Sequence, residues 1–190
     1  MKKYVVVLLF TFLFISCEKA DLSRIPSYSA NNKLQAMVSI PAGSATKYIY
    51  DNEVKAFKVY KVEGVNQKMN FLPAPFNIAF IPSTEDENNK PLDVVILSER
   101  ADFSELIELN LIGAIVLKNS NSSKTFLLSE TLDESKRIFN KEINELKNSE
   151  PKAFGIIVDW LKSYSEKDHD SFFVLNKQEA KELVQKSLMN

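Results

Sequence analysis

The most informative chemical group in this chain of 190 residues is one carboxylate, Asp93, which opens a buried-looking strand in the segment Pro91–Arg100. Carboxylate oxygens are the ligands that hard divalent cations take. Other chemistries find little support, because the 4 glycines lie far apart and form no phosphate-binding loop. The only histidine, His169, lies in a polar turn, which excludes a histidine-clustered zinc site and argues against a histidine-based triad.

Residues 1–17 are expected to be a lipoprotein signal peptide. Two lysines precede an apolar run, Tyr4–Ile15, that is too short to span a bilayer as a helix. The run ends in Ser16-Cys17, and a small residue before a cysteine resembles a bacterial lipobox, in which the cysteine becomes the lipidated first residue. Cys17 is the only cysteine and has no partner for an internal disulfide. The alternative is an ordinary secretory signal with a chance cysteine.

Residues 18–33 are polar and lack a hydrophobic period, which predicts a flexible tether reaching roughly 20–25 Å before a folded domain at 34–190. Removing a leader with two lysines takes the formal net charge from −1 to −3, so acyl chains would hold the protein at a membrane. We therefore expect a lipid anchor and an extracytoplasmic place in the bacterial cell envelope, periplasmic or on the cell surface. The charge gives no basic footprint for nucleic acid.

Segments rich in β-branched and aromatic residues recur through the first two thirds of the domain, with turn-forming residues between them. Gly113 lies inside the longest segment and predicts a bend or a bulge there. The expected strands are Ala36–Ile40, Lys47–Tyr50, Phe57–Val62, Ile78–Ile81, Val94–Ser98, Leu106–Lys118 and Thr125–Leu128.

Three helices are expected in the last third, each opened by a capping box or a proline. The opening signals are Thr131 with Glu134, Pro151, and Asn176 with Glu179. Apolar residues at helical spacing follow each signal, and in the first helix they are Ile138, Phe139, Ile143 and Leu146. Strands followed by helices predict an α+β fold, in which a sheet or small barrel carries helices on one side.

Several motifs occur in an order that points to one enzyme family. They are Val38–Gly43, Lys47-Tyr48, Phe71–Pro82, Pro91–Val94, Ile112–Lys118 and Trp160–Tyr164. Each motif is weak alone, but the ordered set spans nearly the whole domain and resembles the soluble, magnesium-dependent inorganic pyrophosphatases of family I. The resemblance implies an OB-like antiparallel β-barrel with C-terminal helices packed on it.

The resemblance also implies a reaction, the hydrolysis of pyrophosphate to two phosphates. In that family several Mg²⁺ ions neutralise the anion and lower the pKa of the attacking water, and carboxylates hold the ions. Lysine, arginine and tyrosine side chains hold the departing phosphates. The family site therefore has a metal side and a phosphate side.

The metal side is largely missing from this sequence. The family signature Asp-x-Asp-Pro-x-Asp reads Asn88-Asn89-Lys90-Pro91-Leu92-Asp93, so Asp93 is the one acid that matches it. Other residue types also stand where the family has two glutamates, two hairpin aspartates and two tyrosines: Ser39, Ile49, the segment 119–123, Ala74 and Ile78. Lys90 either reverses a charge in the metal site or points to water.

The phosphate side is better matched. Lys47, Lys124 and Tyr164 stand where the family has phosphate-binding residues. Lys61 replaces an arginine, which keeps the charge and loses the bidentate fork. The resemblance therefore implies that these three lysines and Tyr164 bind phosphate.

Three functions are compatible with this pattern. The leading hypothesis is a pyrophosphatase relative that is weakly active or inactive, with impaired Mg²⁺ binding, and that binds pyrophosphate, phosphate or another phosphorylated anion. The second is an active diphosphatase, in which Glu85, Asp86 and Glu87 reach Asp93 and rebuild a metal site; otherwise these acids form a solvated turn. The third is a non-catalytic envelope scaffold. A homo-oligomer is compatible with each of them.

Overall fold

The structure, a computed structural model, describes residues 25–189 apart from residues 47, 52, 55, 67, 70, 139–140 and 166–167. The predicted signal peptide and lipobox lie outside the described residues. Within the described part, no helix has the length and apolarity needed to cross a membrane.

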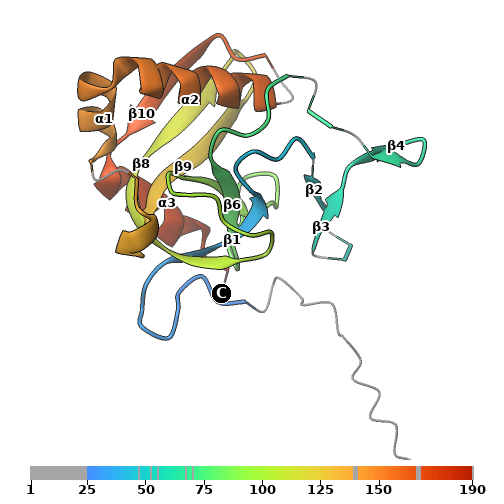
Figure 1. Cartoon of the computed structure of the whole chain (residues 1–190), viewed down its shortest axis with the longest axis horizontal. Helices are drawn as coiled ribbons and strands as arrows, with labels where there is room; N and C mark the ends of the chain where they lie inside the picture. The colour runs from blue at the N-terminus through green and yellow to red at the C-terminus, as the bar shows by residue number, and fades with distance from the viewer. Residues whose placement is uncertain are drawn as a thin grey trace, which may run out of the picture.

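Five strands close into a ring in a mixed sheet, and a sixth strand extends it at one edge (Figure 1). Neighbours in the ring pair antiparallel, except for one parallel pair, β7 with β9. In ring order the strands are β1 (Gln35–Ile40), β6 (Asn77–Ile81), β7 (Leu92–Ile96), β9 (Ser123–Thr131) and β8 (Leu106–Lys118), and β10 (Ser171–Leu175) pairs with β8. The predicted α+β, OB-like fold with C-terminal helices is confirmed, with a mixed sheet in place of a purely antiparallel one.

Two small hairpins lie beside the ring as separate two-stranded sheets. The first pairs β2 (Tyr48–Asp51) with β3 (Ala56–Val59), and the second pairs β4 (Lys61–Val62) with β5 (Val65–Asn66). Figure 1 shows them as an arm on the side away from the helices α1 and α2.

The helices are α1 (Ile143–Ser149), α2 (Pro151–Tyr164) and α3 (Lys177–Ser187), after a short 3-10 turn, η2 (Glu134–Lys136). Pro151 takes the first turn of α2 and Asn176 caps α3 with a full capping box, as predicted. The predicted first helix is wrong at its start, because Thr131 pairs within β9 and the side chain of Asp133 caps η2 instead.

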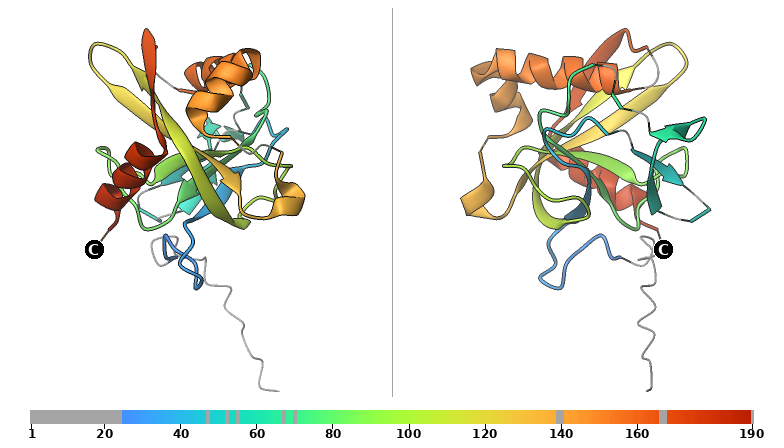
Figure 2. Two further views of the ribbon diagram at one scale, coloured as in Figure 1. Left: turned by 90° about the vertical axis from the view of Figure 1, so that its left-hand side faces the viewer. Right: turned by 45° about the vertical axis from the view of Figure 1, so that its right-hand side comes forward.

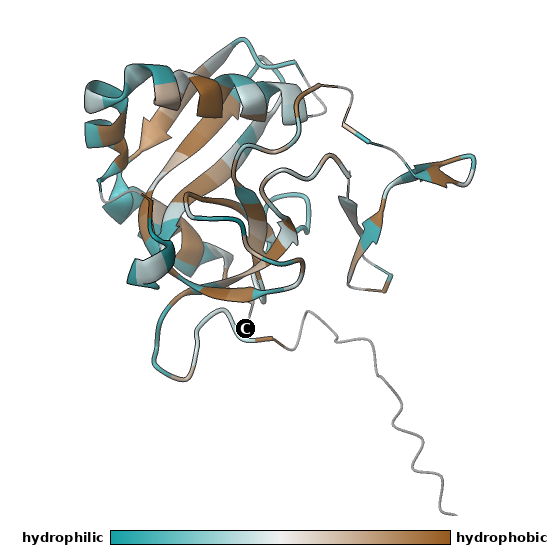
Figure 3. Ribbon diagram, in the orientation of Figure 1, coloured by the Kyte–Doolittle hydropathy of each residue, from teal (hydrophilic) through white to brown (hydrophobic). Residues whose placement is uncertain are grey.

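The strands carry two apolar cores, because successive residues point to opposite faces. In β7, Val95 belongs to the first core, with α1 and α2, whereas Val94 and Ile96 belong to the second, with α3. Figure 2 shows α2 and α3 on opposite sides of the long β8–β9 ribbon, and Figure 3 shows the apolar residues concentrated on the strands. Both cores therefore depend on the same strands.

Gly113 makes the predicted bulge in β8. The register against β9 shifts between Leu111 and Gly113, whose φ is +155°. A Cβ atom at this position would lie 2.5 Å from Cγ2 of Ile143 and 2.6 Å from the carbonyl oxygen of Leu175. The bulge thus lets α1 and β10 approach the sheet closely.

Both ends of the described chain meet at the loop 82–85. The Oγ of Ser27 donates to the carbonyl of Pro82 (2.6 Å) and the Oγ of Ser83 donates to the carbonyl of Ile25 (2.7 Å). From the other end, Ser187 accepts from the amide of Glu85 (2.8 Å) and Met189 donates to Ser83 (3.0 Å). The part of the predicted tether that the structure describes, residues 25–33, is thus bonded to the domain through Ser27 and the carbonyl of Ile25.

Candidate functional site

Asp93 lies near the start of β7, on the face of the first core. Leu92 and Val94 belong to the second core, and the alternation of a strand therefore directs Asp93 to the same side as Val95. Its side chain keeps 20% of its exposure. Asp93 thus stands where the first core meets solvent.

Lys124 on β9 forms an ion pair with Asp93, in which Nζ contacts Oδ2 directly. The parallel register places Asp93 opposite Phe126, and Lys124 lies two positions earlier on the same face of β9. The ammonium also lies 5.5 Å from the centre of the Phe126 ring, within the range of a cation–π interaction. The mixed sheet therefore joins one acid and one base that are far apart in the sequence.

The surroundings of Lys124 favour its charged form. Burial of the ammonium lowers its pKa, but the charge of Asp93 and the hydrogen bond to it outweigh burial, and Asp86 adds to them. The net result is a pKa of Lys124 above its ordinary value. Lys124 is thus a fixed cation at neutral pH, placed against the carboxylate.

Tyr164 reaches the same region through aromatic contacts. Its ring stacks on Trp160 at 5.1 Å with 14° between the planes, and it lies 6.2 Å from the ring of Phe126. The Nε1 of Trp160 donates to the carbonyl of Leu72 (3.1 Å), which fixes the stack. Of the predicted phosphate-binding residues, Lys124 and Tyr164 are therefore neighbours of one ring.

The acids upstream of Asp93 form a tight loop that Asp86 organises. Its Oδ1 accepts from the backbone amides of Asn88 (2.8 Å) and Lys90 (3.0 Å), and its own amide donates to the carbonyl of Lys90 (2.7 Å). Glu85, Glu87 and the side chain of Lys90 are exposed. Asp86 is thus the acid of this loop whose charge acts on Lys124.

Another predicted phosphate-binding lysine does not join this group. Lys61 is exposed on β4, in the arm that Figure 1 shows away from β9, because the hairpin of β4 and β5 buries neither of its strands. Lys47 lies outside the described residues. Among the residues that the structure does describe, no three His, Cys, Asp or Glu side chains form a group that could hold a metal ion.

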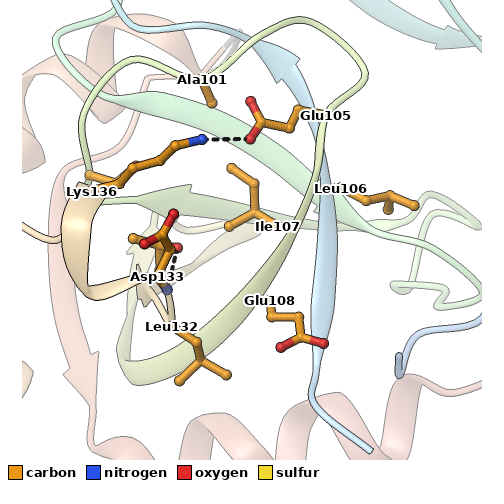
Figure 4. Close-up of a pocket in the computed structure, with 10 residues that line it drawn as sticks. Ala101, Glu105, Leu106, Ile107, Glu108, Leu132, Asp133 and Lys136 are labelled. Carbon is orange, nitrogen blue, oxygen red and sulfur yellow. Dashed lines mark hydrogen bonds and ion pairs between the residues drawn. The ribbon is translucent and has the colours of Figure 1, made fainter. Parts of the chain in front are cut away.

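A cavity of about 350 Å³ lies elsewhere, between the start of β8 and the turn η2 (Figure 4). We call it the acidic cavity, because Glu105, Glu108 and Asp133 line it against a single base, Lys136. The Lys136 ammonium contacts Glu105 Oε1 at 3.0 Å, as the figure shows. None of the predicted site residues that the structure describes lines the acidic cavity.

The sequence predicts Asp93, Lys124 and Tyr164 as site residues, but it does not predict the contacts that connect them. Phe126, which contacts both Lys124 and Tyr164, lies in the predicted strand Thr125–Leu128 and carries no chemical signal of its own. The tight loop has a local sequence signal, which is Asn89 between Asp86 and Lys90. Asparagine tolerates the left-handed conformation that Asn89 adopts there (φ +55°). The pairing of β7 with β9 has no such signal, because no local pattern specifies a parallel partner.

Comparison with known proteins identifies relatives over nearly the whole domain. The family model described as inorganic pyrophosphatase matches residues 36–190. An inorganic pyrophosphatase of Sulfolobus acidocaldarius is 32% identical over 124 residues, covering 64% of this chain and 69% of that protein. One from Saccharolobus solfataricus is 27% identical over 168 residues, covering 86% and 94%. The crystal structure of inorganic pyrophosphatase from Thermus thermophilus matches with a TM-score of 0.68 at 18% identity, covering 89% and 97%.

Proposed function

Because this chain belongs to the inorganic pyrophosphatase family, we propose that it is a member with impaired metal binding, which binds phosphate-type anions and hydrolyses pyrophosphate slowly or not at all. The observation that carries the proposal is the ion pair of Asp93 with Lys124. The one acid that matches the family signature already has an internal cation as its partner.

The described donors do not fit a cluster of magnesium ions. Mg²⁺ supplies this family with an activated water and with charge neutralisation, and it needs octahedral oxygen ligands. Asp93 contacts an ammonium, and Asp86 uses one carboxylate oxygen for two backbone amides. A divalent ion at Asp93 would lie beside the ammonium of Lys124, which keeps its charge because its pKa is raised, and the two cations would repel each other.

The same residues suit an anion. Lys124 keeps 28% of its side chain exposed and offers further N–H donors beyond the one that Asp93 accepts. Tyr164 adds a polar edge beside Phe126, and Lys47 extends the set by family resemblance. Charge-assisted hydrogen bonds of this kind are the strong ones in phosphate recognition.

The first test is hydrolysis of pyrophosphate by the full-length chain with excess magnesium. We expect turnover far below the usual enzyme range of about 1–1000 per second. Turnover inside that range would overturn the proposal.

The second test measures the binding of phosphate and pyrophosphate in the presence of a chelator, as a shift in the melting temperature of the protein. We expect a rise in melting temperature that the pair of substitutions Lys47→Ala and Lys124→Ala abolishes. Lys118→Ala, at an exposed position at the end of β8, is the matched control and should leave the rise unchanged. Absence of any shift in the unmodified protein would favour the scaffold hypothesis.

A second candidate is an active diphosphatase with a rebuilt site. One observation favours it: the charge of Asp86 contributes to raising the pKa of Lys124, the partner of Asp93. In that case magnesium would support turnover, and Asp86→Asn would remove it. Glu87→Gln, at an exposed position of the same loop, should then have no effect.

We also propose that the protein is lipid-anchored at Cys17 and extracytoplasmic in the bacterial envelope. The apolar run before Ser16-Cys17 supports this. Mass spectrometry of the chain purified from membranes should find acyl chains on Cys17, and Cys17→Ser should release the protein from the membrane fraction. An unmodified Cys17 in the membrane-purified chain would overturn the anchor.

A further inference from the structure

A second cavity, of about 430 Å³, lies between the first residues of the described chain, β8 and α3. Its volume is typical of sites for small molecules. Tyr28 and Lys33 line it from the segment before β1, Leu109 and Leu111 from β8, and Lys181 from α3. We call it the lysine cavity.

The floor of the lysine cavity is hydrocarbon. Leu34, Leu109, Leu111 and Val184 line it, and all four belong to the second core with at most 9% of their surface exposed. Asp93 lies on the face of the first core, as shown above. The lysine cavity is therefore a different site from the proposed anion site.

The rim of the lysine cavity is positively charged. Lys33 and Lys181 line it, both are exposed, and none of the described residues that line it is acidic. The nearby Glu130 is fully buried and accepts a hydrogen bond from Asn110, a lining residue (3.3 Å). The neighbouring acid on α3, Glu182, is not a lining residue and accepts a hydrogen bond from Gln178 (3.0 Å). Two uncompensated ammonium groups above an apolar floor, in a chain of net charge −1, favour a ligand with a negative head.

A hydroxyl completes the rim. The Nε2 of Gln185 donates to the hydroxyl oxygen of Tyr28 (2.6 Å). This bond joins the segment before β1 to α3 at the edge of the cavity. Because this hydroxyl accepts from Gln185, its own proton stays available to an acceptor. The rim thus offers three hydrogen-bond donor groups, the ammonium groups of Lys33 and Lys181 and the hydroxyl of Tyr28.

We propose that the lysine cavity binds an amphipathic anion, with a carboxylate or phosphate head on Lys33, Lys181 and Tyr28 and a short hydrocarbon chain on the leucine floor. The anionic head of the ligand pairs with the two lysine charges, and its hydrocarbon chain packs on the leucine floor. The acidic cavity serves as an internal contrast, because its three acids would repel the same ligand.

The test is calorimetric titration of the full-length chain with octanoate and octyl phosphate below their micellar concentrations. We expect saturable binding of both. Acetate and inorganic phosphate, which lack the chain, and octanol, which lacks the charge, should each bind at least about tenfold more weakly at this site. No binding of octanoate or octyl phosphate would overturn the proposal.

Variants assign the binding to the cavity. Lys33→Ala with Lys181→Ala should weaken octanoate binding by about tenfold or more, whereas Lys186→Ala, at an exposed position of α3 outside the cavity, should not. Arginine at both positions should preserve binding, which separates loss of charge from loss of fold. Equal affinity of the double alanine variant and the Lys186→Ala control would refute the assignment.

Two further measurements complete the design. Vesicles of phosphatidylglycerol that compete with octanoate would identify a membrane lipid as the source of the head, and vesicles that do not compete would identify a soluble amphiphile. The double alanine variant should keep its phosphate-induced thermal shift, because Lys124 is untouched. Failure of this inference is thus distinguishable from failure of the proposed function.

Discussion

Replacing Lys124 by methionine keeps the apolar stem and removes the ammonium that faces Asp93. We expect the free energy of unfolding to fall by about 2 kcal/mol. The side chains of the pair are 28% and 20% exposed, so the loss lies between that of an exposed pair, about 0–1 kcal/mol, and that of a buried pair with one partner removed, about 3–5 kcal/mol. The cost arises because the Asp93 carboxylate stays in place without its counter-ion.

Urea denaturation measures this loss, and a second ion pair provides the control. Lys58 contacts Asp51 at 2.7 Å with 49% of the lysine side chain exposed, so Lys58→Met should cost less than about 1 kcal/mol. Adding Asp93→Asn to Lys124→Met should recover part of the loss, since the orphaned charge is then gone. A loss at Lys124 no larger than that at Lys58, or a cycle without coupling, would refute the reasoning.

The ion pair of Lys124 with Asp93 also predicts how the stability of the folded protein changes with pH. The pKa of Lys124 is raised in the folded protein, so its stabilising contribution is fully present below the unfolded value of about 10.4 and is lost as the pH rises through the folded value. Above about pH 10 the unmodified protein should therefore lose stability more steeply than Lys124→Met. Parallel alkaline melts of the two proteins measure the difference.

Three shorter predictions address the scaffold. Gly113→Ala should lower the free energy of unfolding by about 3 kcal/mol, because the added Cβ would lie 2.5 Å from the Ile143 side chain and 2.6 Å from the Leu175 carbonyl oxygen. The matched Gly155→Ala in α2, with open space around the added Cβ, should raise it by about 0.5–1 kcal/mol in denaturation. Asn77→Ala should cost about 3 kcal/mol in the same assay, because this fully buried amide bonds two backbone amides, a hydroxyl and a carbonyl. A backbone amide and Lys136 lower the pKa of Glu105, so its contribution is present above the unfolded value of about 4.3 and lost as the pH falls through the lower folded value; acid melts of Glu105→Gln should be flatter.

Most strands were predictable because their β-branched and aromatic residues, and the turn-forming residues between them, are local signals. The segment Leu106–Lys118 is a strand over its full predicted length, and its glycine bulges as expected. The first helix was predicted too early, since Thr131 carries a capping signal but tertiary pairing extends β9 through it. The strand Ser171–Leu175 was missed because it is short and partly exposed, and its pairing with β8 determines its conformation.

The candidate site divides in the same way. The family resemblance, which depends on residue types and their order, is what predicts Asp93, Lys124 and Tyr164 as site residues. Their mutual contacts depend on the parallel pairing of β7 with β9 and on a ring, Phe126, that carries no chemical signal of its own. Lys61, which was predicted with them, is exposed on the hairpin of β4 and β5, and residue types alone do not determine the direction in which a hairpin projects.

The bonds between the end of α3 and the loop 82–85 couple a helix on the second core to the candidate site on the first. Ser187 and Met189 bond Glu85 and Ser83, next to the loop that Asp86 organises. A substitution that unwinds the last turn of α3 would therefore also loosen the segment that leads into Asp93, although about 100 residues separate the two in the sequence.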